Sequence, residues 1–207
     1  KQTAEQLLKE VRFDAIRGNI SEIKTLASLC GTQEKNSGNM AVSDTMDVEK
    51  ITDKSDHCGK ITGIDGSGRG VDADNADTVT EENLAQHISN AKMLSKKLQT
   101  IVAITGAIDL VTDGSSCYVI RNGNPQMGHV TGAGCQLSGI LTAFLAANPE
   151  NKLQAAAAAG CMMGYAGELA AEKSGQSGSG TYRVSLMDAV SCMDGDILER
   201  GARYEIR

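Results

Sequence analysis

The chain of 207 residues has a formal net charge of −6, with 26 acidic and 20 basic side chains. This length suits one domain, and the acidic charge argues against a nucleic-acid or anionic-membrane partner, which would require a basic face. Apolar residues make up 41% of the chain, enough for a sizeable core. No apolar run approaches the roughly 18 residues that a membrane-spanning helix needs.

The chain has six cysteines, at positions 30, 58, 117, 135, 161 and 192. No two of them form a CxxC pair, and His57-Cys58 lacks the further ligands of a zinc site. The first ten residues, KQTAEQLLKE, read as a charged amphipathic helix rather than a signal peptide. We therefore predict reduced thiols and a cytoplasmic protein.

The predicted elements begin with a helix over residues 4–12 and a short buried strand over residues 13–17. Gly18 ends the strand, and Asn19 then begins a helix with apolar residues Ile23, Leu26, Ala27 and Leu29. A strand, a tight turn and a helix are typical of the start of an α/β unit.

A polar insertion is predicted at about residues 31–77, which are rich in Ser, Thr, Asn, Asp, Lys and Gly. It is too long for an ordinary connection, so we expect it to be mobile or to contain little regular structure. Its glycine-rich run at 63–70 matches neither GxGxxG nor GxxxxGK[ST], and no strand leads into it. A flexible linker is therefore favoured over a nucleotide loop.

The rest of the chain alternates strands and helices. A helix is predicted to begin at Thr80, and three strands follow at 101–104, 109–112 and 117–121. Later helices are predicted from an apolar stripe after Gly134, from the alanine-rich run 153–172, and from a last core segment with Val184, Leu186, Met187, Ala189 and Val190. This order predicts an α/β fold with a mostly parallel sheet flanked by helices.

The sequence His129-Val-Thr-Gly-Ala-Gly-Cys135 precedes one of these helices. Gly132 and Gly134 leave the backbone bare at a helix start, where unpaired N–H groups and the helix dipole favour a phosphate or a developing oxyanion. Cys135 in the first turn is a candidate reactive thiol. The alternative is a small buried cysteine on a core helix.

A second candidate cluster is Arg17-Gly-Asn19-Ile-Ser-Glu22. Arg17 ends a strand, at the edge where open α/β sheets bind ligands, and its guanidinium suits phosphate. Asn19 and Glu22 could support the water shell of Mg²⁺, or they could form a helix capping box. Thr105-Gly106 is a third strand end that could meet a phosphate.

Together these segments resemble the hydroxyethylthiazole kinase family of the ribokinase-like superfamily. The resemblance rests on seven segments in family order: 16–22, 70–72, 102–106, 109–114, 121–123, 130–135 and 178–183. The Gly-Ala-Gly-Cys run is the most specific of them, since most ribokinase-like enzymes look like Gly-x-Gly-Asp there.

The resemblance implies ATP-dependent phosphorylation of the hydroxyl of 4-methyl-5-(2-hydroxyethyl)thiazole in thiamine biosynthesis, with ATP and Mg²⁺. By the family's pattern, Arg17, Thr105 and Gly134 would contact ATP, and Gly132 would line the substrate site. Cys135 would lie beside the substrate hydroxyl, where sugar kinases place an aspartate base, and Glu22 with Asn19 would support Mg²⁺. The family also implies a trimer.

The chain departs from the family in lacking an earlier section with the first strands and much of the thiazole pocket. We therefore expect residues 1–207 to be the C-terminal portion of one kinase domain, inactive alone and compatible with the tail of a bifunctional thiamine-phosphate synthase/hydroxyethylthiazole kinase. Two alternatives remain: another ribokinase-like small-molecule kinase, which Cys135 in place of Asp disfavours, and a catalytically silent portion that serves assembly.

Overall fold

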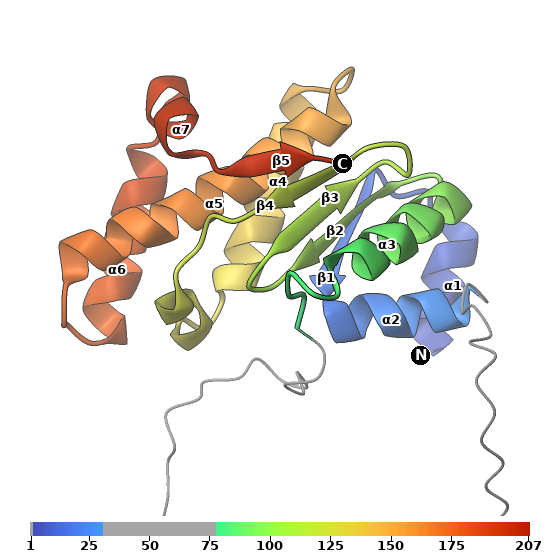
Figure 1. Ribbon diagram of the computed structural model, residues 1–207, viewed down its shortest axis with the longest axis horizontal. Coiled ribbons are helices and arrows are strands. Elements are labelled where there is room, and N and C mark those ends of the chain that lie inside the picture. Colours follow the sequence, from blue (N-terminus) through green and yellow to red (C-terminus); the bar gives the residue numbers. More distant parts are fainter. Residues whose placement is uncertain (1, 31–77) are drawn as a thin grey trace, which may run out of the picture.

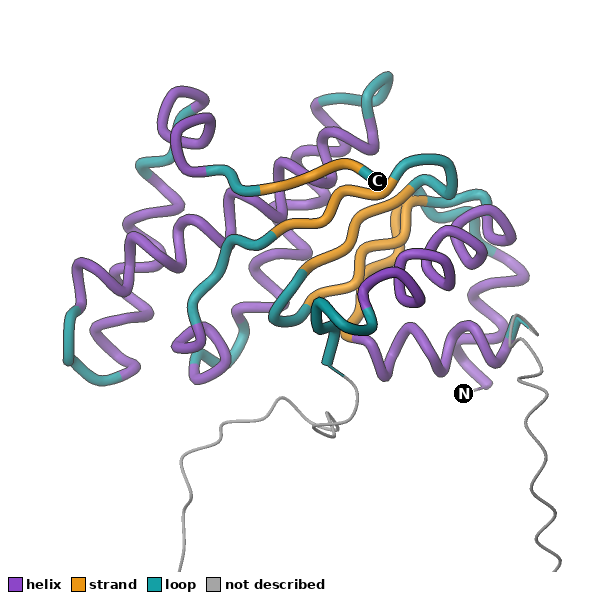
Figure 2. The backbone as a smooth tube through the Cα atoms, in the orientation of Figure 1, coloured by secondary structure: helices purple, strands orange, loops and turns teal. Residues whose placement is uncertain are grey.

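The computed structural model describes residues 2–30 and 78–207 (Figures 1 and 2). The predicted insertion at 31–77, with its glycine-rich run and His57-Cys58, lies outside the described residues. The first part contains α1 (Gln2–Glu10), β1 (Ala15–Asn19) and α2 (Ile20–Leu29). The second part contains α3 (Leu84–Leu98), β2 (Ile101–Thr105), β3 (Asp109–Thr112), β4 (Cys117–Ile120), the short 3-10 helix η2 (Pro125–His129), α4 (Ala133–Ala147), α5 (Lys152–Ser174), α6 (Ser179–Ser191), α7 (Gly195–Gly201) and β5 (Tyr204–Ile206).

The described strands form one sheet in the order β1-β2-β3-β4-β5. Only β1 and β2 run parallel, whereas the β2–β3, β3–β4 and β4–β5 pairs are antiparallel. The α/β class with flanking helices is therefore confirmed, but the prediction of a mostly parallel sheet is wrong for this part of the chain. The links 106–108 and 113–116 are too short for the crossover that parallel strands require, so they close hairpins instead.

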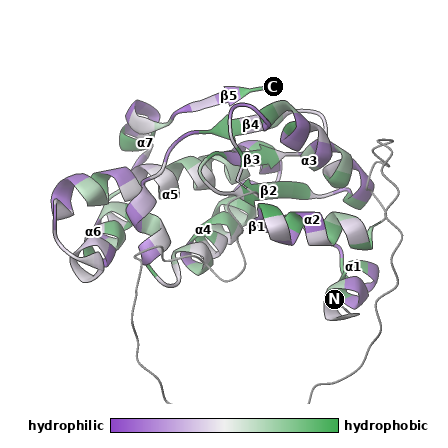
Figure 3. Cartoon of the chain, turned by 60° about the horizontal axis from the view of Figure 1, so that its bottom comes forward, coloured by the Kyte–Doolittle hydropathy of each residue, from purple (hydrophilic) through white to green (hydrophobic). Residues whose placement is uncertain are grey.

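Both faces of the sheet are covered, as the continuous apolar run of β2 predicts. Helices α2 and α3 cover one face, where Val102 and Ile104 point, and α4 and α5 cover the other, where Ile101 and Ala103 point. Figure 3 shows β2 mostly in the hydrophobic colour, in line with its buried side chains. None of the helices in the described residues is long and apolar enough to cross a membrane.

The C-terminal third builds a further apolar cluster, beside those on the two faces of the sheet. Long helix α5 packs along α6 (Figure 1), and the buried side chains between them and α4 are Val130, Leu137, Met163, Ala166, Ala170, Tyr182 and Leu186. The predicted last core helix is correct as α6, but it is followed by α7 and β5, and Val184 and Met187 are exposed. Leu186 is buried as predicted, with Ala189 and Val190 packed beside it, and Tyr182 and Ser185 complete the buried face.

Two helix starts differ in how well the sequence defines them. For α2, the prediction of a start at Asn19 is confirmed, since Asn19 is the N-cap. For α3, the predicted start at Thr80 is wrong: residues 81–83 form a turn and the helix begins at Leu84. The Asn83 side chain binds the Thr80 amide and the Thr78 carbonyl, which stabilises this turn before the helix.

Candidate functional site

The strand register brings two predicted site segments together. Asn19 lies opposite Thr105 in the parallel β1–β2 pair, so both strands end at the same edge of the sheet. The Nη2 of Arg17 donates a hydrogen bond of 2.9 Å to Oγ1 of Thr105. The Nε of Arg17 is buried and has no hydrogen-bond partner within the described residues. A buried donor without a partner is costly, so this nitrogen is suited to an anionic ligand.

The start of α4 faces the same arginine. Gly132 is the N-cap with a φ of 93°, a left-handed conformation that favours glycine. The Ala133 amide donates to the Val130 carbonyl, and the Gln136 amide donates to the Gly132 carbonyl. These bonds leave the amides of Gly134 and Cys135 without a protein acceptor among the described residues. The positive end of the helix therefore retains two free donors.

Gly134 lies directly against the arginine. A Cβ at this position would be 3.0 Å from Nη1 and 3.1 Å from Nη2 of Arg17. The bare backbone thus allows the guanidinium to approach the helix start, where both favour negative charge. Three of the predicted site residues, Arg17, Thr105 and Gly134, are brought together in this way.

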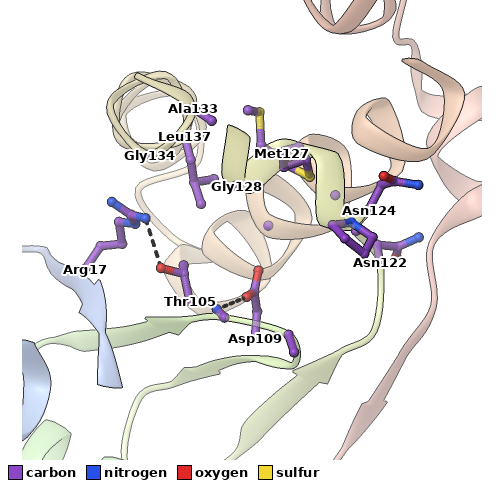
Figure 4. A pocket seen from close by; sticks show the side chains of 17 residues that line it. Arg17, Thr105, Asp109, Asn122, Asn124, Met127, Gly128, Ala133, Gly134 and Leu137 are labelled. Atoms are coloured by element: carbon purple, nitrogen blue, oxygen red, sulfur yellow. Dashed lines mark hydrogen bonds between the residues drawn. The ribbon is translucent and has the colours of Figure 1, made fainter. Parts of the chain in front are cut away.

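These three residues line a pocket of about 520 Å³. Figure 4 shows Arg17 at one end and Asn122 and Asn124 at the other, with Thr105 and Asp109 between them. The remaining lining residues are mostly small or apolar: Gly106, Ala107, Gly123, Pro125, Met127, Gly128, Ala133, Leu137, Gly160, Met163 and Gly164. The pocket therefore has a cationic end and an apolar middle, as a nucleotide-sized ligand would need.

The four other predicted site residues lie outside the lining of this pocket. Gly132 is the N-cap residue before the lining residues Ala133 and Gly134, and Cys135 is exposed on the first turn of α4. The alternative of Cys135 as a small buried core residue is therefore wrong. Burial raises the pKa of the Cys117 and Cys161 thiols to about 11, so those two cysteines stay protonated.

Asn19 and Glu22 form the capping box that the sequence offered as the alternative to a metal site. The Asn19 amide donates to Glu22 Oε2 at 2.7 Å, and the Glu22 amide donates to Asn19 Oδ1 at 2.8 Å. Within residues 2–30 and 78–207, no three His, Cys, Asp or Glu side chains gather in a cluster that could hold a metal ion. A metal role for Glu22 and Asn19 therefore stays a prediction.

Sequence reasoning missed Asp109, which lies half-buried in the pocket. Its Oδ1 accepts a hydrogen bond of 2.8 Å from the Gly106 amide and closes the turn after β2 (Figure 4). Burial raises the pKa of Asp109 to about 7, against the opposing effects of the Gly106 amide and the Arg17 charge. The available signal was its position, four residues after Thr105 at the start of the next strand.

We expect the free energy of unfolding of Asp109→Asn to rise above that of the wild-type protein as the pH rises. Because the folded pKa lies above that of the unfolded chain, Asp109 favours folding below about pH 4, and this contribution is lost as the pH rises to about 7. Asparagine keeps an acceptor for Gly106 but does not ionise. At 1.36 kcal/mol per pKa unit, the gain at pH 8 is at most about 4 kcal/mol. Urea unfolding of both proteins at pH 5 and pH 8 checks this; an equal difference at both values contradicts it.

Comparisons with known proteins identify the family of the chain. The model of the hydroxyethylthiazole kinase family matches residues 35–196. The chain is 41% identical to a hydroxyethylthiazole kinase of Clostridium acetobutylicum over 99% of its length, and 33% identical to one of Desulfovibrio desulfuricans, also over 99%. It covers 63% and 62% of those proteins, so it spans about three fifths of their length.

The fold is similar to a solved hydroxyethylthiazole kinase of Pyrococcus horikoshii OT3, with a TM-score of 0.69 at 21% identity. That similarity covers all of this chain and 59% of the other. The family match and the relatives agree with the resemblance carried by the Gly-Ala-Gly-Cys run. The prediction that Arg17 ends a strand at Gly18 is wrong, since β1 continues to Asn19. The chain belongs to the hydroxyethylthiazole kinase family.

Proposed function

We propose that this chain carries the nucleotide-binding part of an enzyme that phosphorylates the hydroxyl of 4-methyl-5-(2-hydroxyethyl)thiazole with ATP, in thiamine biosynthesis. The observation that carries the proposal is the Arg17 guanidinium lying against the bare start of α4, with a buried Nε that has no partner among the described residues. Arginine and free helix amides together suit a polyphosphate. We propose further that residues 1–207 are the C-terminal portion of one kinase domain.

In this proposal the triphosphate lies at the cationic end of the pocket, between Arg17, Thr105 and Gly134. The base then lies toward the apolar middle, where Met127, Leu137 and Met163 provide surface for a flat ring. The side chains of Asn122 and Asn124 lie at the far end. Asn122 is engaged by Glu168, Gly201 and Arg203, so the NH₂ group of Asn124 is the donor that this end offers to a ligand.

Phosphoryl transfer passes through a loose transition state, so positioning and charge neutralisation dominate. Arg17 and the free amides of α4 would neutralise the phosphate oxygens while the thiazole alcohol forms its bond to phosphorus and ADP leaves. Cys135, one residue beyond Gly134, is the candidate to accept or orient the hydroxyl proton. Gly132, at the N-cap, would lie on the thiazole side.

Mg²⁺ would supply charge neutralisation between the phosphates. It prefers oxygen ligands, keeps several waters and often uses only one or two carboxylates together with the phosphates. Glu22 uses Oε2 in the capping box, and Oε1 takes no part in that box. One carboxylate oxygen therefore fits this role, and we propose Glu22 as the supporting carboxylate with Asn19 holding it in place.

The proposal is tested by incubating the full-length protein with the thiazole alcohol and ATP and following the phosphorylated product by mass spectrometry. We expect Arg17→Gln to raise the KM for ATP by about tenfold to a hundredfold, the range of a charged hydrogen bond. Arg200→Gln, which changes an exposed arginine on α7, is the matched control and is expected to behave as wild type.

The alternatives give different results in the same assay. Preference for a sugar, pyrimidine or hydroxymethylpyrimidine alcohol would identify another kinase of the superfamily. If the wild-type protein neither binds ATP nor forms product, the chain is a silent portion that serves assembly. A trimer and a cytoplasmic location also stay predictions; the oligomer is checked by analytical ultracentrifugation of the full-length protein.

A further inference from the structure

A dense polar network lies behind the far wall of the pocket. The side chain of Glu168, on α5, is only 17% exposed, and its two oxygens accept four hydrogen bonds. Two come from the Arg203 guanidinium, at 2.8 Å each, one from the Gly123 amide at 2.7 Å and one from the Asn122 side chain at 3.1 Å. Asn122 and Gly123 themselves line the pocket.

Arg203 completes the network from the C-terminal segment. Its main-chain amide donates to Asn122 Oδ1 at 2.7 Å, and its Nη2 donates to the Arg121 carbonyl at 3.0 Å. The Arg121 amide in turn donates to the Arg203 carbonyl at 2.9 Å. Asn122 also donates to the Gly201 carbonyl at 2.9 Å and is 5% exposed. Segments about 45 and 80 residues away in sequence thus hold residues 121–123 in place.

Only a carboxylate satisfies this arrangement. All four groups around Glu168 are N–H donors, so the position needs a side chain that accepts with both oxygens. Glutamine would keep one acceptor and place an NH₂ group against donors, which leaves a buried polar group unpaired. A surface ion pair alone would contribute little, but here the same carboxylate also holds a main-chain amide of the pocket wall.

We propose that Glu168 and Arg203 form a positioning pair that fixes the main chain of residues 121–123 and thereby sets the affinity of the pocket for the base end of the nucleotide. The proposal rests on the proposed function. It extends the site to the C-terminal segment, which is not among the lining residues of the pocket. Because the triphosphate end is formed by Arg17 and α4, the pair acts on nucleotide binding and leaves the transfer step unchanged.

The test compares Glu168→Gln with Glu172→Gln in the full-length protein. Glu172 is one turn further along α5 and exposed, so it serves as the matched control. We expect Glu168→Gln to raise the KM and the Kd for ATP by about three- to tenfold, the range of one or two net hydrogen bonds, with kcat within about twofold. Glu172→Gln is expected to match wild type in all three.

A second variant guards against failure to fold. Arg203→Lys changes an exposed side chain, 56% accessible, and keeps the charge but loses the fork that binds both oxygens. We expect Arg203→Lys to raise the KM and the Kd for ATP, but by less than Glu168→Gln does. The double variant is expected to bind ATP no more weakly than Glu168→Gln alone, because partners of one network are not additive.

Two results overturn the proposal: an ATP Kd for folded Glu168→Gln or Arg203→Lys equal to that of wild type, or a fall in kcat with KM unchanged. If the wild-type protein binds no ATP, the proposed function fails first, so the two failures are distinguishable.

Discussion

Replacing Gly134 by valine in the full-length protein is expected to lower kcat/KM for thiazole phosphorylation by at least about a hundredfold, the size of losing one preorganised donor to a developing anion. A Cβ added at Gly134 would lie only 3.0 Å from Arg17 Nη1. The added branches would displace the guanidinium and cover the free amides at the start of α4. Initial-rate kinetics with both substrates measures the effect.

Cys135→Ala, one residue further, is expected to cost less. It leaves the amides and Arg17 in place, and a loose transition state depends little on removing the alcohol proton. We expect a loss below the roughly hundredfold that marks the lower end of general acid–base contributions. If Cys135→Ala is as inactive as Gly134→Val, the thiol is the base and this ranking is wrong.

Replacing Gly164 by alanine is expected to destabilise the protein by about 1–3 kcal/mol, the usual cost of overpacking. A Cβ there would be 2.7 Å from both Cβ and the carbonyl oxygen of Asn122. Since one of these atoms belongs to the backbone, the far wall of the pocket would have to move away from α5. The midpoint of urea unfolding measures the change, and a weaker ATP affinity is expected to accompany it.

Gly139→Ala is the matched control, because it makes the same change inside helix α4. A Cβ at Gly139 meets nothing within 4 Å. Alanine is the better helix former, so we expect a gain of about 1 kcal/mol. A Gly164→Ala protein that gains stability as Gly139→Ala does would show that Asn122 is not packed against α5 as described.

The strands and helices of the described residues were largely predictable from short-range patterns. The apolar run of β2 and the turn residues after β3 mark their elements, and the apolar stripe after Gly134 marks α4. Val184 and Met187 show where the pattern fails: both are apolar and helical, yet exposed. Which face of α6 is covered depends on its contact with α5, and its own periodicity does not decide this.

The cationic end of the pocket was predictable because its members lie at or within two residues of a strand or helix end and carry recognisable chemistry. Arg17, Thr105 and Gly134 were singled out in this way. Asp109 and the wall from Asn122 to Gly128 were missed, since nothing local distinguishes an aspartate or asparagine in a pocket from one in a surface turn.

The sequence by itself determined the family, the α/β class and the bare helix start beside Cys135, because each depends on residues close together in the chain. Only the tertiary structure decided the bond between Arg17 and Thr105, the covered face of α6, and the network of Glu168 and Arg203. These features join segments up to about 88 positions apart, as in the bond between Arg17 and Thr105. Such contacts form only when packing brings distant donors to acceptors, and no local pattern encodes that distance.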